Sequence, residues 1–174
     1  MKKNVALFGL GRIGVMHAKN IVLNSKLKLK YVYDINQKIS KIYSKKLKCI
    51  NLKNPSKAFS DKSVDIIFIS STTSTHIPLI TKSVKSKKLV FCEKPLDLNI
   101  NKVIKCKKYL KKYKPKIQLG FNRRYDPGHY ALKRSLLLGK IGKLEKIIIT
   151  SRDPAPPSLK YLKSSGGIFR DMTI

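Results

Sequence analysis

Three glycines near the amino terminus have the spacing of a phosphate-binding loop. Gly9, Gly11 and Gly14 form a G-x-G-x-x-G pattern that follows a short apolar run and opens a segment with helical periodicity. In such a loop Gly9 permits the turn, Gly11 lets the backbone approach a pyrophosphate, and Gly14 allows close packing of a helix on a strand. The helix that starts at Arg12 and Ile13 would offer its amide groups to the phosphates. A tight turn without a ligand is the alternative.

An acidic residue follows at the distance that a dinucleotide site requires. Asp34 closes a second apolar run, 20 residues after Gly14. Its carboxylate would accept hydrogen bonds from both adenosine ribose hydroxyls and would repel a 2′-phosphate, so the sequence favours NAD over NADP. Asp34 could instead cap a helix or shape a turn.

One lysine stands apart from the rest by its position. Glu93, Lys94 and Pro95 directly follow the apolar run 89–92, and ligands of open α/β sheets bind at the carboxyl ends of strands. The proline restricts the backbone of Lys94, so its ammonium would be fixed. Such an ammonium could hydrogen-bond a substrate hydroxyl and stabilise a developing alkoxide.

A parallel sheet is needed to bring these residues together. Short β-branched runs alternate with amphipathic segments over about 120 residues, which is typical of a doubly wound α/β sheet of the Rossmann type. Strands are expected over 4–8, 29–33, 65–70, 89–92 and 116–120. Helices are expected over 13–23, 37–47, 76–86 and 101–113, with Ile13, Met16, His17, Ile21 and Val22 near one stripe of the first.

The character of the sequence changes after Gly120. A helix is expected over 130–138, and a strand over 144–151 that would belong to another sheet. The run Asp-Pro-Ala-Pro-Pro at 153–157 excludes regular structure. We therefore place a domain boundary near residue 120, with an incomplete second α+β domain over 121–174.

The composition is strongly basic but does not by itself indicate a nucleic-acid-binding protein. The net charge is +30, and 33 of the 39 basic residues are lysine, whereas base readout and bidentate phosphate contacts favour arginine. The lysines are spread over the whole chain, and the abundance of Lys, Ile, Asn and Tyr matches A/T-rich codons. We expect no specific nucleic acid and no membrane partner. The three cysteines lack a paired spacing and predict free thiols in a reducing cytoplasm.

Several segments resemble one oxidoreductase family. GLGRIG at 9–14, Asp34, SSTTSTH at 70–76 and FCEKP at 91–95 are similar in order and spacing to the Rossmann domain of the Gfo/Idh/MocA family. GFNRRYDPGH at 120–129, GKIG at 139–142, SRDPAPP at 151–157 and SGGIFRDMTI at 165–174 resemble its inositol 2-dehydrogenase branch. The resemblance covers the whole chain, but only about the first half of a usual family member.

The resemblance implies a catalytic group made of a lysine, an aspartate and a histidine. Lys94 and Asp171 match the first two, and the family's histidine would follow directly after Ile174. In the family the histidine takes the hydroxyl proton, the lysine polarises the hydroxyl and the aspartate positions substrate or histidine. No metal is implied. The residues expected at the cofactor are Gly9, Gly11, Arg12, Ile13, Gly14, Asp34, Ser71, Thr73, His76, Glu93, Lys94 and Arg123.

Other roles are open for some of these residues. Arg123 could instead form a salt bridge with Asp126 or lie at the domain seam, and Arg152 and Asp153 could contact substrate or only shape their loop. His17 is expected to be a packing or surface residue.

The function that the resemblance implies is NAD-dependent oxidation of a secondary hydroxyl of a cyclic polyol or sugar to a ketone. We expect these 174 residues alone to turn over poorly or not at all, and a full-length form to be a cytoplasmic homo-oligomer, either a dimer or a tetramer. The alternatives are a non-catalytic dinucleotide-binding fragment, another sugar dehydrogenase of the family, and a basic protein that binds polyanions.

Overall fold

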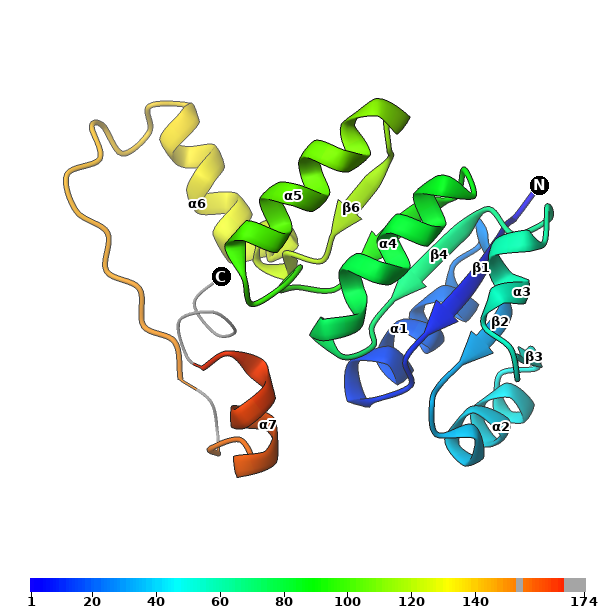
Figure 1. Cartoon of the computed structure of the whole chain (residues 1–174). Helices are drawn as coiled ribbons and strands as arrows, with labels where there is room; N and C mark the ends of the chain where they lie inside the picture. Colours follow the sequence, from blue (N-terminus) through cyan, green and yellow to red (C-terminus); the bar gives the residue numbers. More distant parts are fainter. Residues whose placement is uncertain (153–154, 168–174) are drawn as a thin grey trace. The chain divides into compact units, whose positions relative to one another are not determined.

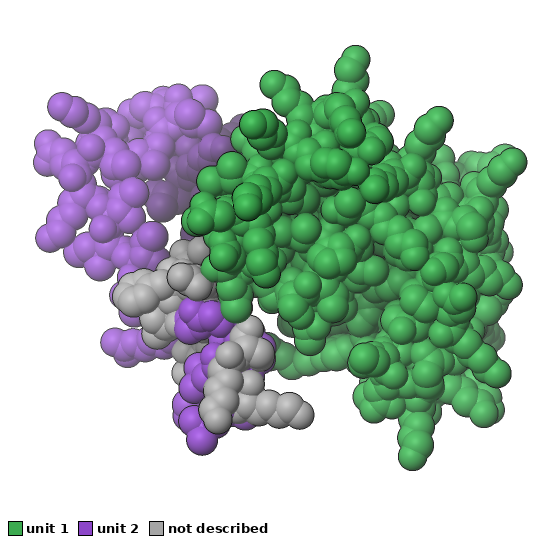
Figure 2. Space-filling model, in the orientation of Figure 1, with its two compact units in different colours: residues 1–120 green, residues 121–174 purple. Residues whose placement is uncertain are grey.

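The chain divides into two compact units, Met1–Gly120 and Phe121–Ile174 (Figure 2). The computed structural model describes residues 1–152 and 155–167. Asp153 and Asp171, which the sequence analysis singled out, lie outside the described residues. No helix in these two described ranges is long and apolar enough to cross a membrane.

Unit 1 is built on a parallel sheet of six strands in the order β3-β2-β1-β4-β5-β6 (Figure 1). The order reverses between β1 and β4, which creates the switch point where open α/β sheets bind ligands. All strands expected before residue 121 are confirmed within a few residues, and one short strand, β3, was not predicted. The strands are β1 Lys3–Phe8, β2 Leu27–Tyr33, β3 Ile50–Asn51, β4 Ile66–Ile69, β5 Leu89–Cys92 and β6 Ile117–Leu119.

Helices cover both faces of the sheet. One apolar cluster joins the first face to α1 (Arg12–Leu23) and α2 (Gln37–Lys46). A second cluster joins the opposite face to α3 (Ser56–Ser60), α4 (His76–Lys85) and α5 (Ile100–Leu110). The expected helix over 101–113 ends as a short 3-10 turn, η2 (Lys111–Tyr113). Two-sided covering explains why the central strands read as unbroken apolar runs.

The buried side of α1 differs from the expected stripe. Ile13, Met16 and Val22 are exposed, whereas Gly14, Ala18 and Ile21 are buried. These three buried residues recur at helical spacing, and two of them are small, so the helix axis lies close to the sheet. The larger apolar residues are displaced to the flanks, because close approach leaves them no room beneath the helix.

Unit 2 contains η3 (Asn122–Tyr125), α6 (Pro127–Leu137) and α7 (Leu159–Ser165). The carboxylate of Asp126 accepts a hydrogen bond from the amide of His129 at 2.9 Å and caps α6. The strand expected over 144–151 is wrong, because this run forms no strand in the described chain. An extended run needs a neighbour to pair its backbone groups, and Ile147, Ile148 and Ile149 are exposed.

A carboxylate at the amino ends of the strands ties two layers of unit 1 together. Asp61 Oδ2 accepts hydrogen bonds from Lys30 Nζ at 2.6 Å and from the Tyr31 hydroxyl at 2.7 Å. Its Oδ1 accepts bonds from the amide and hydroxyl of Ser63. The hydrogen bond from Lys30, followed by those from Ser63 and Tyr31, holds the pKa of Asp61 well below its ordinary value. The ionised carboxylate of Asp61 therefore joins β2 to the segment before β4.

We expect Asp61→Asn to lower the free energy of unfolding at pH 7 by about 1–3 kcal/mol, because charge-assisted hydrogen bonds are lost. The folded pKa is depressed, so the contribution of the carboxylate is present above the unfolded pKa of about 4 and declines as pH falls below it. Urea unfolding at pH 7 and pH 3 measures both effects, with Glu145→Gln as the exposed control. A difference from wild type that is equal at the two pH values would contradict the role of Asp61.

Candidate functional site

The carboxyl ends of β1, β2, β4 and β5 carry loops that gather most of the predicted cofactor residues (Figure 1). Gly9 has φ +92°, and its amide donates to the carbonyl of Tyr33 at 2.8 Å. The hydroxyl of Ser70, at the end of β4, donates to the carbonyl of Gly9 at 3.0 Å. The glycine loop is therefore anchored to β2 on one side and to β4 on the other.

The three glycines of the motif meet different surroundings. A Cβ on Gly9 would lie 2.6 Å from backbone atoms of Ser70, and a Cβ on Gly14 would lie 2.0 Å from the carbonyl oxygen of Gly9. A Cβ on Gly11 would meet nothing within 4 Å. Packing within the protein thus requires glycine at positions 9 and 14, whereas Gly11 faces open space at the start of α1.

The first turn of α1 has the electrostatics of an anion site. Gly11 is the N-cap residue, and its carbonyl accepts the first helical bond from Val15 at 2.9 Å. Within the described residues no side chain caps this end, and the first turn holds no carboxylate. Arg12 and Ile13 are exposed there. Amide groups, the positive end of the helix dipole and the open space at Gly11 fit a diphosphate.

Asp34 is bound to the same glycine loop. Its Oδ2 accepts a hydrogen bond from the amide of Leu10 at 2.7 Å, and its Oδ1 accepts one from the amide of Asn36 at 2.8 Å. The capping residue of α2 is Asn36, so Asp34 shapes the turn before the helix but does not cap it. A half-buried carboxylate therefore lies beside the glycine loop.

The loop after β4 carries three of the predicted residues. The Ser71 hydroxyl contacts the Thr75 hydroxyl at 2.6 Å, and Thr73 opens η1 (Thr73–Thr75). His76 is only 1% exposed; its Nε2 lies 3.0 Å from the carbonyl oxygen of Ser71 and its Nδ1 lies 2.8 Å from that of Pro95. His76 thus lies beneath the loops after β4 and β5 and contacts both.

The loop after β5 carries Glu93 and Lys94. The amide of Glu93 donates to the carbonyl of Ile69 at 2.8 Å, and the Lys94–Pro95 peptide bond is cis. Glu93 Oε1 lies 2.6 Å from Nε2 of His17, a residue of α1. The loop therefore begins with a backbone hydrogen bond to β4 and is also contacted by the side chain of His17 from α1.

Sequence reasoning missed two residues of this region. Ser70 supports the glycine loop, although only its neighbour Ser71 was singled out. His17 was expected to pack or to lie on the surface; it does contact aromatic rings, but it also pairs with Glu93. A histidine one turn after the last glycine of the motif was the available signal, and its partner is 76 residues away in the sequence.

Two predicted site residues do not belong to the described part of unit 1. Arg123 belongs to unit 2 and donates to the Ser151 hydroxyl at 3.0 Å, while Asp126 pairs with His129 instead. Asp171 lies outside the described residues, so its catalytic role stays a prediction. Cys92, the last residue of β5, is buried, and this burial raises the pKa of its thiol to about 12.

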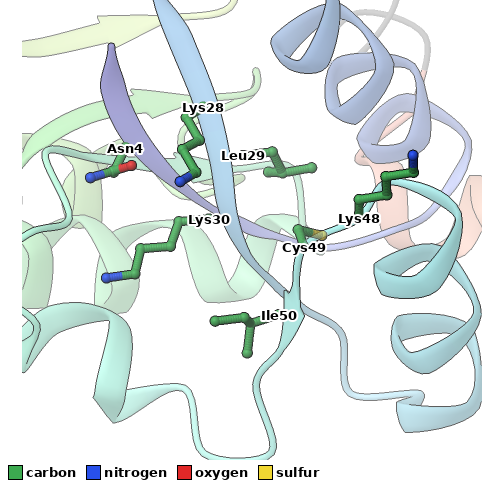
Figure 3. A pocket seen from close by; sticks show the side chains of 7 residues that line it. All are labelled: Asn4, Lys28, Leu29, Lys30, Lys48, Cys49 and Ile50. Atoms are coloured by element: carbon green, nitrogen blue, oxygen red, sulfur yellow. The ribbon is translucent and has the colours of Figure 1, made fainter. Parts of the chain in front are cut away.

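A separate cavity of about 410 Å³ lies at the opposite edge of the sheet, near the amino ends of β1 and β2 (Figure 3). Its lining includes Lys28, Lys30 and Lys48, and the ammonium of Lys30 is already bound to Asp61. Ligands of doubly wound sheets bind at the carboxyl edge, so this cavity is not the candidate site. In the described residues no group of three or more His, Cys, Asp or Glu side chains could hold a metal ion.

A glycine turn at the switch point, an uncapped helix start and an acidic residue after the second strand define a dinucleotide-binding domain of the Rossmann class. Residues 3–121 match the family described as "Oxidoreductase family, NAD-binding Rossmann fold", the Gfo/Idh/MocA family. The chain belongs to this family, as its sequence motifs predicted, and its cofactor is NAD.

The chain is similar to inositol dehydrogenases. It is 39% identical to inositol 2-dehydrogenase of Rhizobium meliloti over 175 residues, which are 100% of this chain and 52% of the relative. The crystal structure of a myo-inositol dehydrogenase from Corynebacterium glutamicum gives a TM-score of 0.92 at 41% identity over 99% of this chain and 52% of that one. The chain therefore spans about half the length of these relatives.

A third relative was solved with bound ligands. Scyllo-inositol dehydrogenase from Lactobacillus casei, solved with NAD(H) and scyllo-inositol, gives a TM-score of 0.76 at 28% identity. The match covers 82% of this chain and 43% of that one.

Substitutions at two glycines should separate folding from cofactor binding. We expect Gly14→Ala to lower the thermal midpoint by about 4 °C or more, because its Cβ would overlap the Gly9 carbonyl. Gly11→Ala should leave the midpoint unchanged and weaken NAD binding at least tenfold, since its Cβ fills only the ligand's space. Calorimetric melting and NAD titration test the pair. Unchanged NAD affinity in Gly11→Ala would place the diphosphate elsewhere.

Proposed function

We propose that this chain supplies the NAD-binding half of a dehydrogenase that oxidises a secondary hydroxyl of a cyclic polyol of the inositol type. The observation that carries the proposal is the position of Lys94. It follows β5, at the same edge of the sheet as the glycine loop. The three relatives described above are all inositol dehydrogenases. The polyol and the activity are inferences for this chain, because the relatives are about twice as long.

The residues of the glycine loop would hold the diphosphate of the cofactor. The absence of a side chain at Gly11 leaves space for the diphosphate. The amides of Arg12, Ile13 and Gly14, in the first turn of α1, would donate hydrogen bonds to it. Asp34 would bind the ribose hydroxyls with the lone pairs that the amides of Leu10 and Asn36 leave available. When bound, NAD supplies the hydride acceptor for a carbinol carbon.

The loops after β4 and β5 would face the reactive end of the cofactor. Ser71 and Thr73 would lie along the cofactor. His76 would support the two loops, since its ring is buried against carbonyl oxygens of both. Lys94 would donate a hydrogen bond to the substrate hydroxyl and stabilise negative charge on that oxygen. Asp171 would position the substrate, and Arg123 would lie near it. These last two roles rest on the sequence resemblance.

Lys94→Ala should separate turnover from cofactor binding in the native polypeptide that carries this sequence. We expect NADH formation with myo-inositol or scyllo-inositol to fall by roughly 10²–10⁴-fold, because a group that acts in proton transfer is removed. The NAD dissociation constant should stay within about threefold, as the diphosphate and ribose contacts remain. Lys102→Ala, on the exposed side of α5, is the matched lysine control. Equal losses of turnover and NAD affinity in Lys94→Ala would contradict a catalytic role.

Asp34→Asn should change the choice between NAD and NADP. The single amide oxygen can still accept the bond from Leu10, so the glycine loop keeps this contact, while the bond from Asn36 and the charge that repels a 2′-phosphate are lost. We expect the ratio of NADP to NAD dissociation constants to fall about tenfold or more, with the thermal midpoint within a few degrees of wild type. Titration of both cofactors measures the ratio. An unchanged ratio would show that another group excludes NADP.

A further inference from the structure

The loop that carries Lys94 is contacted by histidines from opposite faces of the sheet. His17 belongs to α1, whose buried residues pack in one core cluster, and His76 belongs to α4, whose residues pack in the other. His17 contacts the side chain of Glu93, and His76 contacts the backbone of Pro95. The two contacts thus fall on the residues immediately before and after Lys94.

The contact between His17 and Glu93 is largely shielded from water. The two side chains are 16% and 18% exposed, and their atoms lie 2.6 Å apart. The imidazole packs against the ring of Phe68 at 4.7 Å and that of Phe91 at 5.4 Å, and these two rings stack at 4.0 Å. A hydrogen bond to a carboxylate is stronger in such surroundings than in water, and the rings fix the plane of the histidine.

Glu93 is turned into the protein, where its oxygens have partners. Oε1 contacts His17, and Oε2 accepts a hydrogen bond from the amide of Lys94 at 3.2 Å. A Cβ on Gly120 would lie 3.0 Å from Oε1, so the glycine after β6 leaves room for the carboxylate. The acidic side chain of Glu93 therefore holds the backbone amide of Lys94 by a hydrogen bond.

His76 provides the second attachment. It is 1% exposed, and its two ring nitrogens lie against the carbonyl oxygens of Pro95 and Ser71. The loop after β5 is thereby joined to the loop after β4, on the side of the sheet opposite to His17.

We propose that His17 and His76 are positioning residues that clamp the Glu93–Pro95 backbone from the two faces of the sheet and so fix the position of Lys94. The bearing of this clamp on turnover rests on the proposed function, but its bearing on the loop does not. Catalytic groups lose efficiency when they are displaced by about 1 Å, so a lysine on a short loop needs such support. His17 also joins the loop to the helix whose start would bind the diphosphate.

The amide of Lys94 reports the clamp directly, because it donates to Glu93. Hydrogen exchange of this amide, followed by NMR in the full chain, is compared among three variants. His17→Phe keeps an aromatic ring against Phe68 but removes the nitrogen, and we expect exchange at least about tenfold faster. His17→Gln keeps a donor near the position of Nε2 and should restore exchange to within about threefold of wild type. Met16→Phe, at an exposed neighbouring position of α1, is the control and should resemble wild type.

A second route to the carboxylate keeps the test decisive if His17→Phe folds poorly. Gly120→Ala leaves His17 unsubstituted and pushes on the Glu93 carboxylate and on the edge of the Phe91 ring, so it should also accelerate Lys94 exchange at least about tenfold. The amide of Ala6 in the central strand monitors folding in every variant and should keep its protection. Wild-type exchange at Lys94 in folded His17→Phe or Gly120→Ala would overturn the clamp, as would a failure of His17→Gln to restore it.

The kinetic constants distinguish a residue that positions Lys94 from a residue that only stabilises the fold. In the native polypeptide, His17→Phe should lower kcat with the inositol substrate about tenfold or more, leave KM for NAD within about threefold, and regain kcat in His17→Gln. A rise in KM for NAD with unchanged kcat would overturn the positioning role. If the wild type oxidises no polyol, the proposed function fails, and the Lys94 exchange still decides the clamp.

Discussion

The close approach of α1 to the end of β1 is the constraint on which the rest of unit 1 depends. A Cβ at residue 14 would lie 2.0 Å from the Gly9 carbonyl oxygen, so the approach exists only because that residue is glycine. It sets the helix start at the switch point of the sheet, where its amides can meet a diphosphate. It also brings His17, one turn further along, within reach of the loop after β5. The absence of a side chain at Gly14 therefore allows α1 to connect the glycine loop with the loop that carries Lys94.

Three carboxylates of this basic chain lie at structural junctions of unit 1. The sequence has 9 acidic and 39 basic residues, so the carboxylates can pair with only a minority of the lysines and arginines. Asp34 joins the glycine loop to the turn before α2, Asp61 joins β2 to the segment before β4, and Glu93 joins α1 to the loop after β5. Each accepts several hydrogen bonds. The excess charge thus lies on the surface, while the acidic residues determine the local geometry.

Local patterns predicted the Rossmann sheet well, and they failed where a distant partner decides the outcome. The apolar runs and the glycine motif predicted the strands of unit 1 other than β3, because β-branched runs buried on both faces have few alternative structures. The run 144–151 has strand composition but forms no strand in the described chain, since pairing depends on a neighbour and not on propensity. Met16 lies on the expected apolar stripe yet is exposed, because small residues face the sheet. His17 was undervalued because its partner, Glu93, is far away in the sequence.

The exposed isoleucines at 147–149 have a colloidal consequence. Backbone groups that lack a strand partner, next to apolar side chains, can pair with the same segment of another chain. The net charge of +30 opposes such encounters by mutual repulsion. Added salt shortens the range of that repulsion to about 10 Å at 0.1 M, while the apolar attraction persists. For these 174 residues, added salt therefore favours contacts between copies of the 147–149 segment.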